Sequence, residues 1–214
     1  MKKILTIICA SFLLISTAKA EMTYGFGLMT GQVSSSGTET EGTAADTSTR
    51  SKSFDEIFVG ADIFAEKEFA NGVSLGVSYV PVDVELGSGK RTDTATTTAK
   101  GGAENDTGTR SASADLSDLI TLYGNFPIGG NGFYGLAGMH LVTVKTSETL
   151  PNSSYGDEDI LGGLIGVGAK NGKTKIELFY SDFEDISLSS SGGDNSNSVT
   201  ADADAVTLRL TIGF

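Results

Sequence analysis

The sequence predicts an all-β protein: a closed eight-stranded antiparallel transmembrane β-barrel that follows a cleaved signal peptide. Three observations predict it. The N-terminus carries a short apolar segment, many later segments alternate between apolar and polar side chains, and the connections between those segments are alternately short and long. A chain of 214 residues suffices for one domain. We therefore expect a single barrel domain over residues 21–214.

Residues 1–20 have the layout of a secretory signal peptide. Two lysines precede an apolar run over residues 4–15, and Ala18 and Ala20 supply the small side chains that a signal peptidase reads. The run is too short to cross a bilayer as a helix, which needs about 20 residues. We expect cleavage after Ala20 and a mature chain that enters a membrane only as strands.

Composition excludes several classes of function. The only cysteine, Cys9, lies in the signal segment, so the mature chain is expected to have no disulfide and no cysteine-ligated metal. Removing Lys2, Lys3 and Lys19 from the formal charge of −12 leaves −15. Such an acidic balance disfavours nucleic acid and anionic lipid headgroups as partners. No cofactor is expected.

Eight segments alternate with the period of a β-strand. They cover residues 22–33, 54–68, 73–86, 115–127, 133–146, 158–170, 174–187 and 203–214. A change of parity after Pro81 indicates a bulge in the third segment. Alternation alone fits both a water-soluble sandwich, whose apolar faces meet a protein core, and a membrane barrel, whose apolar faces meet lipid.

The lengths of the connections decide between these two architectures. Three are short and contain Gly and Asn, at residues 70–72, 129–132 and 171–173. The four that alternate with them, 34–53, 87–114, 147–157 and 188–202, are long and polar. A barrel with both termini in the periplasm produces this pattern, because short turns stay on the near side and long loops face outside. The aromatic residues beside the short turns are expected to form an interfacial girdle: Phe69, Phe126, Phe133, Tyr134 and Phe214.

The chain thus resembles the small outer-membrane β-barrel superfamily, the porin-like and OmpA/OmpX-like eight-stranded proteins, over its whole mature length. The last strand carries the resemblance most specifically. Its alternating Leu208, Leu210 and Ile212 and the terminal Phe214 look like the signal by which members of the superfamily are recognised for outer-membrane insertion. The resemblance implies a Gram-negative outer membrane as the location, with its lipid and its insertion machinery as partners, and we expect a monomer.

Six charged residues are predicted to point into the barrel: Glu56, Asp62, Glu66, Lys175, Glu177 and Arg209. The interior of an eight-stranded barrel is just wide enough for side chains to fill it, and an unpaired charge there is costly. We therefore predict a network of ion pairs that plugs the lumen, with Arg209 at its centre. The alternative is a charged gate in a narrow pore.

His140 is the only histidine, and neither residue 138 nor residue 142 is a serine, so we interpret it as a barrel residue and not as a catalytic base. Acidic clusters at residues 157–159, 182–185 and 202–204 lack the spacing of a calcium loop and are interpreted as solvated rim charges. No metal site is expected. Residues 92–98, rich in threonine, are predicted to be part of a disordered extracellular loop.

Together these features predict a non-enzymatic outer-membrane protein with a structural or surface-interaction role, whose long acidic loops contact an extracellular ligand. The alternative is a narrow porin-like channel for ions or small polar solutes, with a preference for cations set by the acidic lumen.

Overall fold

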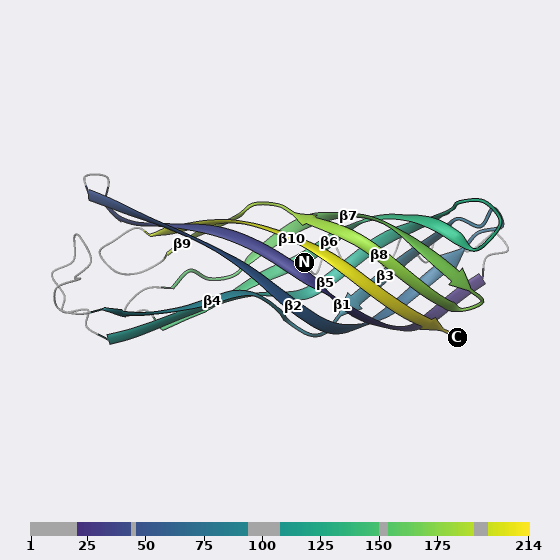
Figure 1. Cartoon of the computed structure of the whole chain (residues 1–214), viewed down its shortest axis with the longest axis horizontal. Coiled ribbons are helices and arrows are strands. Elements are labelled where there is room, and N and C mark those ends of the chain that lie inside the picture. Colours follow the sequence, from purple (N-terminus) through teal and green to yellow (C-terminus); the bar gives the residue numbers. More distant parts are fainter. Residues whose placement is uncertain (1–20, 44–45, 94–107, 150–153, 191–196) are drawn as a thin grey trace.

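The protein is a long, twisted antiparallel barrel in the computed structural model (Figure 1). The structure describes residues 21–43, 46–93, 108–149, 154–190 and 197–214. The predicted signal peptide and part of the threonine-rich segment, residues 94–98, lie outside the described residues. Among the residues that are described, no helix is long and apolar enough to cross a membrane.

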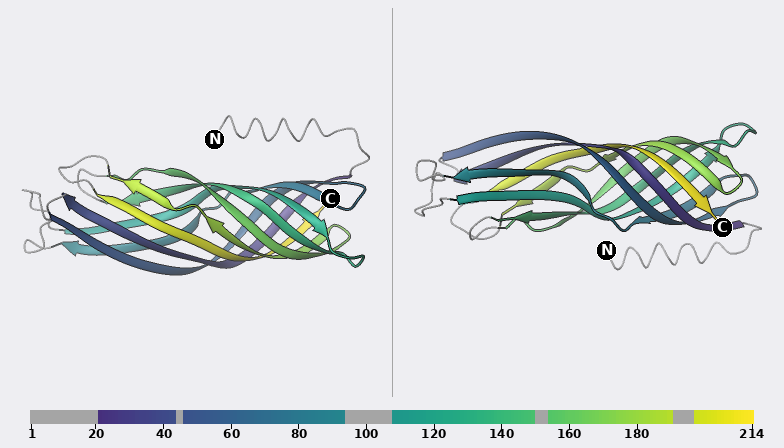
Figure 2. Two further views of the ribbon diagram at one scale, coloured as in Figure 1. Left: turned by 90° about the horizontal axis from the view of Figure 1, so that it is seen from above. Right: turned by 60° about the horizontal axis from the view of Figure 1, so that its bottom comes forward.

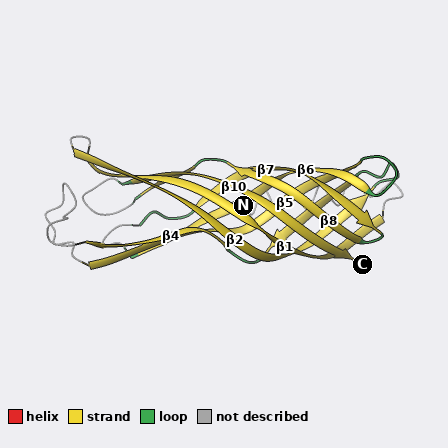
Figure 3. Cartoon of the chain, in the orientation of Figure 1, coloured by secondary structure: helices red, strands yellow, loops and turns green. Residues whose placement is uncertain are grey.

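Ten strands make up the wall, and Figure 3 shows how little of the described chain lies outside them. They are β1 (Glu21–Thr43), β2 (Asp46–Glu68), β3 (Ser74–Val80), β4 (Val84–Asp93), β5 (Gly108–Pro127), β6 (Phe133–Glu148), β7 (Glu158–Asn171), β8 (Thr174–Phe183), β9 (Ile186–Ser189) and β10 (Ser198–Gly213). The sheet runs β1-β2-β3-β5-β6-β7-β8-β10, and β10 pairs with β1 from Gly25↔Gly213 to Thr40↔Ser198. This pairing closes the ring.

Eight wall positions carry the ten strands, which confirms the predicted eight-stranded barrel. β4 continues the position of β3 along β5, and β9 continues that of β8 along β10. The first interruption covers residues 81–83 and so includes the position of the predicted parity change, and the register of β4 also shifts between Glu85 and Gly87. Pro81 has no amide hydrogen to contribute to a ladder, so the strand ends in front of it.

The two ends of the barrel differ. The end that carries the three predicted tight turns is called the short-turn end here, and the opposite end the hairpin end (Figure 2). Gly72, Gly129, Gly132 and Gly172 in these turns have positive φ angles between 60° and 80°. Glycine adopts positive φ angles at low cost, so the glycines in these sequences are what allows the turns to be tight.

A belt of exposed apolar side chains surrounds the outside of the barrel from the short-turn end to about its middle. It includes Tyr24, Phe26, Leu28, Ile57, Val59, Ile63, Ile165, Val167, Ile176, Leu178, Tyr180, Val206, Leu208, Leu210, Ile212 and Phe214. Such a band on the outside of a closed barrel is the surface that hydrocarbon requires. Irregular backbone cannot face lipid, and here the belt is carried by paired strands.

Two of the four predicted long loops, 34–53 and 87–114, are strand over nearly all of their described residues, so their assignment as loops was wrong. The other two, 147–157 and 188–202, each retain a connection outside the strands. β1 continues from Leu28, its last large exposed apolar residue, to Thr43. These fifteen residues, at roughly 3.3 Å each, correspond to about 50 Å along the strand. β1 stays paired with β2 as far as Thr43↔Asp46, and β4 with β5 as far as Asp93↔Gly108. At the tips of the hairpins, beyond both the belt and the apolar interior, a strand faces neither lipid nor an apolar core, so the sequence alternation ends although the hydrogen-bond ladder continues.

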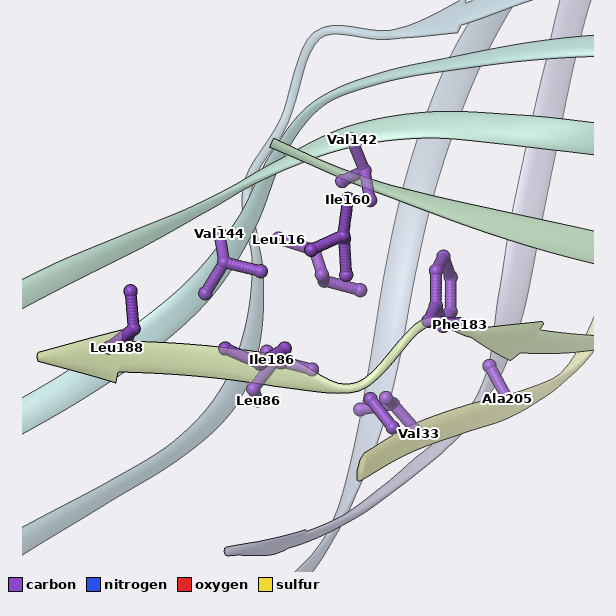
Figure 4. Packing of buried hydrophobic residues seen from close by; sticks show 11 residues of the cluster. Val33, Leu86, Leu116, Val142, Val144, Ile160, Phe183, Ile186, Leu188 and Ala205 are labelled. Carbon is purple, nitrogen blue, oxygen red and sulfur yellow. The ribbon is translucent and has the colours of Figure 1, made fainter. Parts of the chain in front are cut away.

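The interior of the hairpin half holds an apolar cluster (Figure 4). Its buried members are Val33, Leu86, Leu116, Val142, Val144, Ile160, Phe183, Ile186, Leu188, Ala203 and Ala205. Val142 and Val144 are at most 1% exposed. The barrel therefore has apolar side chains on its outside in the half next to the short-turn end, and on its inside in the half next to the hairpin end. Polar side chains fill the remaining interior.

Candidate functional site in the barrel interior

Buried charges cross the lumen in the half of the barrel that the belt surrounds. Arg209 of β10 pairs with Asp62 of β2, and its Nη1 donates to Oε2 of Glu177 on β8 at 2.8 Å. Lys175 of β8 pairs with Glu66 of β2. We call these five residues the ionic layer. All are at most 8% exposed, and the two carboxylates that Arg209 binds have side chains with no exposed surface.

Neutral hydrogen-bond donors also bind the carboxylates of the ionic layer. The hydroxyl of Tyr134 donates to Oε1 of Glu177 at 2.8 Å, and the amide of Asn125 donates to Oε2 of Glu66 at 3.0 Å. The guanidinium of Arg209 also lies over the ring of Tyr123, 5.6 Å from its centroid. Charges packed between hydrogen bonds and aromatic faces leave the lumen filled at this level.

Glycines make room for the large side chains of this layer. Gly168 pairs with Tyr134 across β6 and β7, and a Cβ at Gly168 would lie 2.4 Å from Cζ of that ring. Gly76 stands in the same relation to Tyr123, with 2.2 Å to the ring. No side chain fits at such distances. This eight-stranded barrel thus accommodates each of these two tyrosines inside by placing its ring over a glycine of the neighbouring strand.

Five of the six residues predicted for the lumen meet in the ionic layer, and Glu56 does not. Its Cα pairs with that of Val33, a buried interior residue, but Glu56 itself is exposed. β2 pairs with β3 only over residues 63–68, so Glu56 stands where one side of β2 has no ladder and water reaches it. Tyr134 is a second correction, since it points into the lumen and not to the interfacial girdle.

His140 links three strands beside the ionic layer. Its Nδ1 lies 2.8 Å from Oγ1 of Thr121 on β5, and its Nε2 lies 2.9 Å from Oγ of Ser181 on β8. The ring stacks on Phe183 with centroids 5.4 Å apart. Gly162 of β7, which lies between β6 and β8, pairs with His140. Because Gly162 has no side chain, the ring of His140 can reach across β7 to β8. We call Thr121, His140 and Ser181 the hydroxyl–histidine relay.

Sequence reasoning missed Ser181 because it searched for a serine on the strand of His140 itself. The contact crosses the whole width of β7, and no local pattern encodes a side chain two strands away. The signal that could have found it is the pair of glycines, 162 and 163, opposite His140 and its neighbour in the register. That register becomes visible only in the folded sheet.

A cavity of about 60 Å³ lies between the ionic layer and the apolar cluster. Apolar side chains from most strands line it, including Met29, Val33, Val80, Leu116, Leu164 and Ala205. Its polar boundary is formed by Arg209, Asp62, Ser78, Thr207 and all three residues of the hydroxyl–histidine relay. The interior thus has a filled ionic layer, a small cavity and a filled apolar cluster in series.

The acidic residues near the hairpin end act as hydrogen-bond acceptors in the fold. Oε2 of Glu158 accepts the amide of Ser187 at 2.8 Å, and Oδ1 of Asp159 accepts the hydroxyl of Thr143 at 2.7 Å. Glu184, at the break between β8 and β9, accepts the amide of Leu161 at 3.0 Å. Over the described residues, no group of three His, Cys, Asp or Glu side chains is arranged to hold a metal ion.

The comparisons with known proteins concern the fold. No family model and no curated protein matches the chain. Among solved structures, the outer membrane protein OprG from Pseudomonas aeruginosa is similar at 13% identity and a TM-score of 0.51, over 89% of this chain and 95% of that one. This likeness confirms the predicted outer-membrane barrel fold, and at such identity it shows the fold alone.

Two further solved structures match below a TM-score of 0.5. Ail, the attachment invasion locus protein of Yersinia pestis, in complex with the heparin analogue sucrose octasulfate, matches at 13% identity and a TM-score of 0.37, over 87% of this chain and 99% of that one. The outer membrane protease OmpT from Escherichia coli matches at 9% identity and 0.47, over 92% and 98%.

Proposed function

We propose that this protein is a non-enzymatic outer-membrane barrel that anchors long β-hairpins for interaction at the cell surface. One observation carries the proposal: the lumen is filled by two successive layers, whereas the strands continue far beyond the apolar belt. A barrel built to conduct would need a continuous polar path. A barrel built to present a surface needs a stable base and a rigid extension.

The two layers fill the lumen by different chemistry. In the ionic layer every charge has an opposite charge beside it, so an ion in transit would have to break a buried pair. In the apolar cluster, which lies further along the same axis, an ion would lose its hydration without compensation. Both features favour the surface role over the narrow channel that the sequence left open.

The hairpins offer polar, hydroxyl-rich surfaces. A groove of about 530 Å³ at the hairpin end is lined by residues of β1, β2, β9 and β10, with Ser36, Thr38, Ser51 and Ser187 among them. The hydroxyl of Tyr155 donates to Oε1 of Glu39 at 3.0 Å and ties the connection before β7 to the first hairpin. Such contacts support a shaped surface for an extracellular ligand with many hydrogen-bonding groups.

The non-enzymatic part of the proposal is supported by the hydroxyl–histidine relay. In acyl-transfer triads a carboxylate orients the histidine that activates the serine. Here the nitrogen that faces away from Ser181 meets the hydroxyl of Thr121 instead. The relay is also buried, with Ser181 2% and His140 3% exposed, so a large acyl substrate does not reach it from the surface.

Planar-bilayer recording of the purified protein tests the closed lumen. We expect no steady conductance from barrels whose folding has been verified by heat-modifiable gel mobility. Steady channels with a preference for cations would support the narrow channel instead, and the surface role as stated would then be wrong.

Labelling of intact cells tests the location and the orientation. In a Cys9→Ser background, Ser51→Cys on the first hairpin should react with a membrane-impermeant maleimide from outside. The matched variant Asn71→Cys, at the short-turn end, should react only after the outer membrane is permeabilised. Both positions are exposed, so accessibility is equal apart from the side of the membrane. The opposite pattern, or labelling of both, would contradict the proposed topology.

A further inference from the structure

The cavity between the two layers has features that a plug does not need. It joins an apolar wall to a polar boundary with unused hydrogen-bonding capacity, and it reaches the outside of the barrel. These three features define what the cavity can hold.

The hydroxyl–histidine relay has a hydrogen that no acceptor in the described structure takes. A neutral imidazole donates from one nitrogen and accepts at the other. One hydroxyl, of Thr121 or Ser181, therefore gives its hydrogen to the ring, and the other accepts the ring N–H and keeps its own hydrogen free. Neither hydroxyl makes a further hydrogen bond among the described residues. Thr121 and Ser181 are 7% and 2% exposed, and both line the cavity.

The barrel wall has a gap beside this cavity. The ladder between β2 and β3 stops at Ile63↔Tyr79, and β4 pairs with β5, so over the described residues no backbone ladder joins β2 to β4 from Ile63 towards the hairpin end. The two strands are linked there by a side chain, since Lys52 Nζ donates to the carbonyl of Ser88 at 3.2 Å. Val82 lies in the gap. It lines the cavity, although 42% of its surface is exposed.

Apolar side chains border the gap on the side of the belt. Ile57 and Val59, on the adjacent part of β2, are 82% and 81% exposed and belong to the belt. Gly60, the next residue of β2, lies beside Val82: a Cβ at Gly60 would be 3.6 Å from the Val82 side chain. The cavity therefore comes to the barrel surface at Val82, with the belt on one side of the gap and the exposed Glu56 and Asp83 on the other.

We propose that this cavity binds a small uncharged molecule that joins an apolar body to a hydrogen-bond acceptor, such as a short ketone. The acceptor takes the free hydroxyl hydrogen of the relay, and the apolar body packs against Val33, Leu116 and Leu164. A charged molecule is excluded because the cavity offers no counter-charge that the ionic layer has not already paired. A volume of about 60 Å³ corresponds to roughly four to six water-sized spheres, which limits the ligand to about as many non-hydrogen atoms.

The single histidine of the chain provides a direct probe. Untagged protein whose histidine is ¹³C-labelled at Cε1 alone, folded in detergent micelles, gives one imidazole signal. We expect 2-butanone to shift this signal with saturation. Its isostere 2-methyl-1-butene has a CH₂ group in place of the oxygen, and we expect it to bind about three- to tenfold more weakly, which is the worth of one hydrogen bond.

Two variants separate binding in the cavity from solvent effects in the micelle. Ala205→Leu places a larger side chain in the cavity wall and should abolish the saturable shift. Val206→Leu adds a methylene at the adjacent residue, which points outward and is 50% exposed, and should leave the shift unchanged. Heat-modifiable gel mobility shows whether each variant is folded. The comparison of 2-butanone with 2-methyl-1-butene uses the wild-type protein and does not depend on either variant.

Three results would overturn the proposal. Absence of a saturable shift with both probes means that the cavity holds only water or nothing. Equal affinity for ketone and alkene means that the relay does not recognise an acceptor. A shift that persists in folded Ala205→Leu protein means that the ketone acts elsewhere. None of these results bears on the surface role, which depends on the hairpins and not on this cavity.

Discussion

Replacing Arg209 with methionine removes the charge that holds two buried carboxylates in place. Arg209 donates to Glu177 at 2.8 Å and pairs with Asp62, and neither carboxylate side chain has exposed surface. Methionine fills much of the same volume, so the substitution tests the charge more than the packing. Loss of one partner of a buried pair costs about 3–5 kcal/mol. We expect a loss of that size in the free energy of unfolding.

Lys170→Met is the matched control. Lys170 pairs with Glu68 at the same 2.8 Å, but the two side chains are 33% and 42% exposed. Water already solvates such a pair, and its loss should cost about 0–1 kcal/mol. Urea unfolding of both variants in lipid vesicles, followed by circular dichroism and by heat-modifiable mobility, gives the comparison. The chain has no tryptophan, which rules out the usual fluorescence readout.

A triple variant isolates the cause. Adding Asp62→Asn and Glu177→Gln to Arg209→Met removes the stranded charges and should recover part of the lost stability. The reasoning is refuted if Arg209→Met unfolds within about 1 kcal/mol of the wild type, or if Lys170→Met costs as much. Failure of the triple variant to recover any stability would show that the arginine acts through its packing.

Three further predictions concern other parts of the chain. Gly27→Ala should cost about 1–3 kcal/mol in urea unfolding because its Cβ would lie 1.9 Å from Oδ1 of Asp62, whereas Gly130→Ala, with nothing within 4 Å, should be neutral. Asp115, outside the belt, has a pKa raised first by burial and then by neighbouring carboxylates, so its ionisation destabilises the fold as the pH rises through that pKa. Asp115→Asn should therefore raise the thermal midpoint at neutral pH, and the gain should shrink below the ordinary pKa of aspartate; an equal gain at both pH values would contradict this. Phe214→Ser should lower the amount of folded barrel in outer-membrane fractions if the last strand is an insertion signal, and unchanged amounts would argue against that role.

Much of the barrel could be predicted because its determinants are local. Alternation along β10 and β8 follows from a wall with lipid on one side, and the glycines of the short turns follow from the φ angles that tight turns need. The hairpins could not be predicted in this way. A strand with water on both faces has no alternation to detect, although its backbone ladder is as regular as within the membrane.

The sequence by itself determined the ring of strands, its two unlike ends and five of the charges that face inward. Only the tertiary structure decided which charges meet, because Arg209, Asp62 and Glu177 come from three strands that the closed ring brings together across the lumen. The same holds for Ser181 beside His140, for the cavity that they bound and for the exposure of Glu56. Alternation is a property of one strand, whereas a contact inside a barrel depends on the register and curvature of all of them.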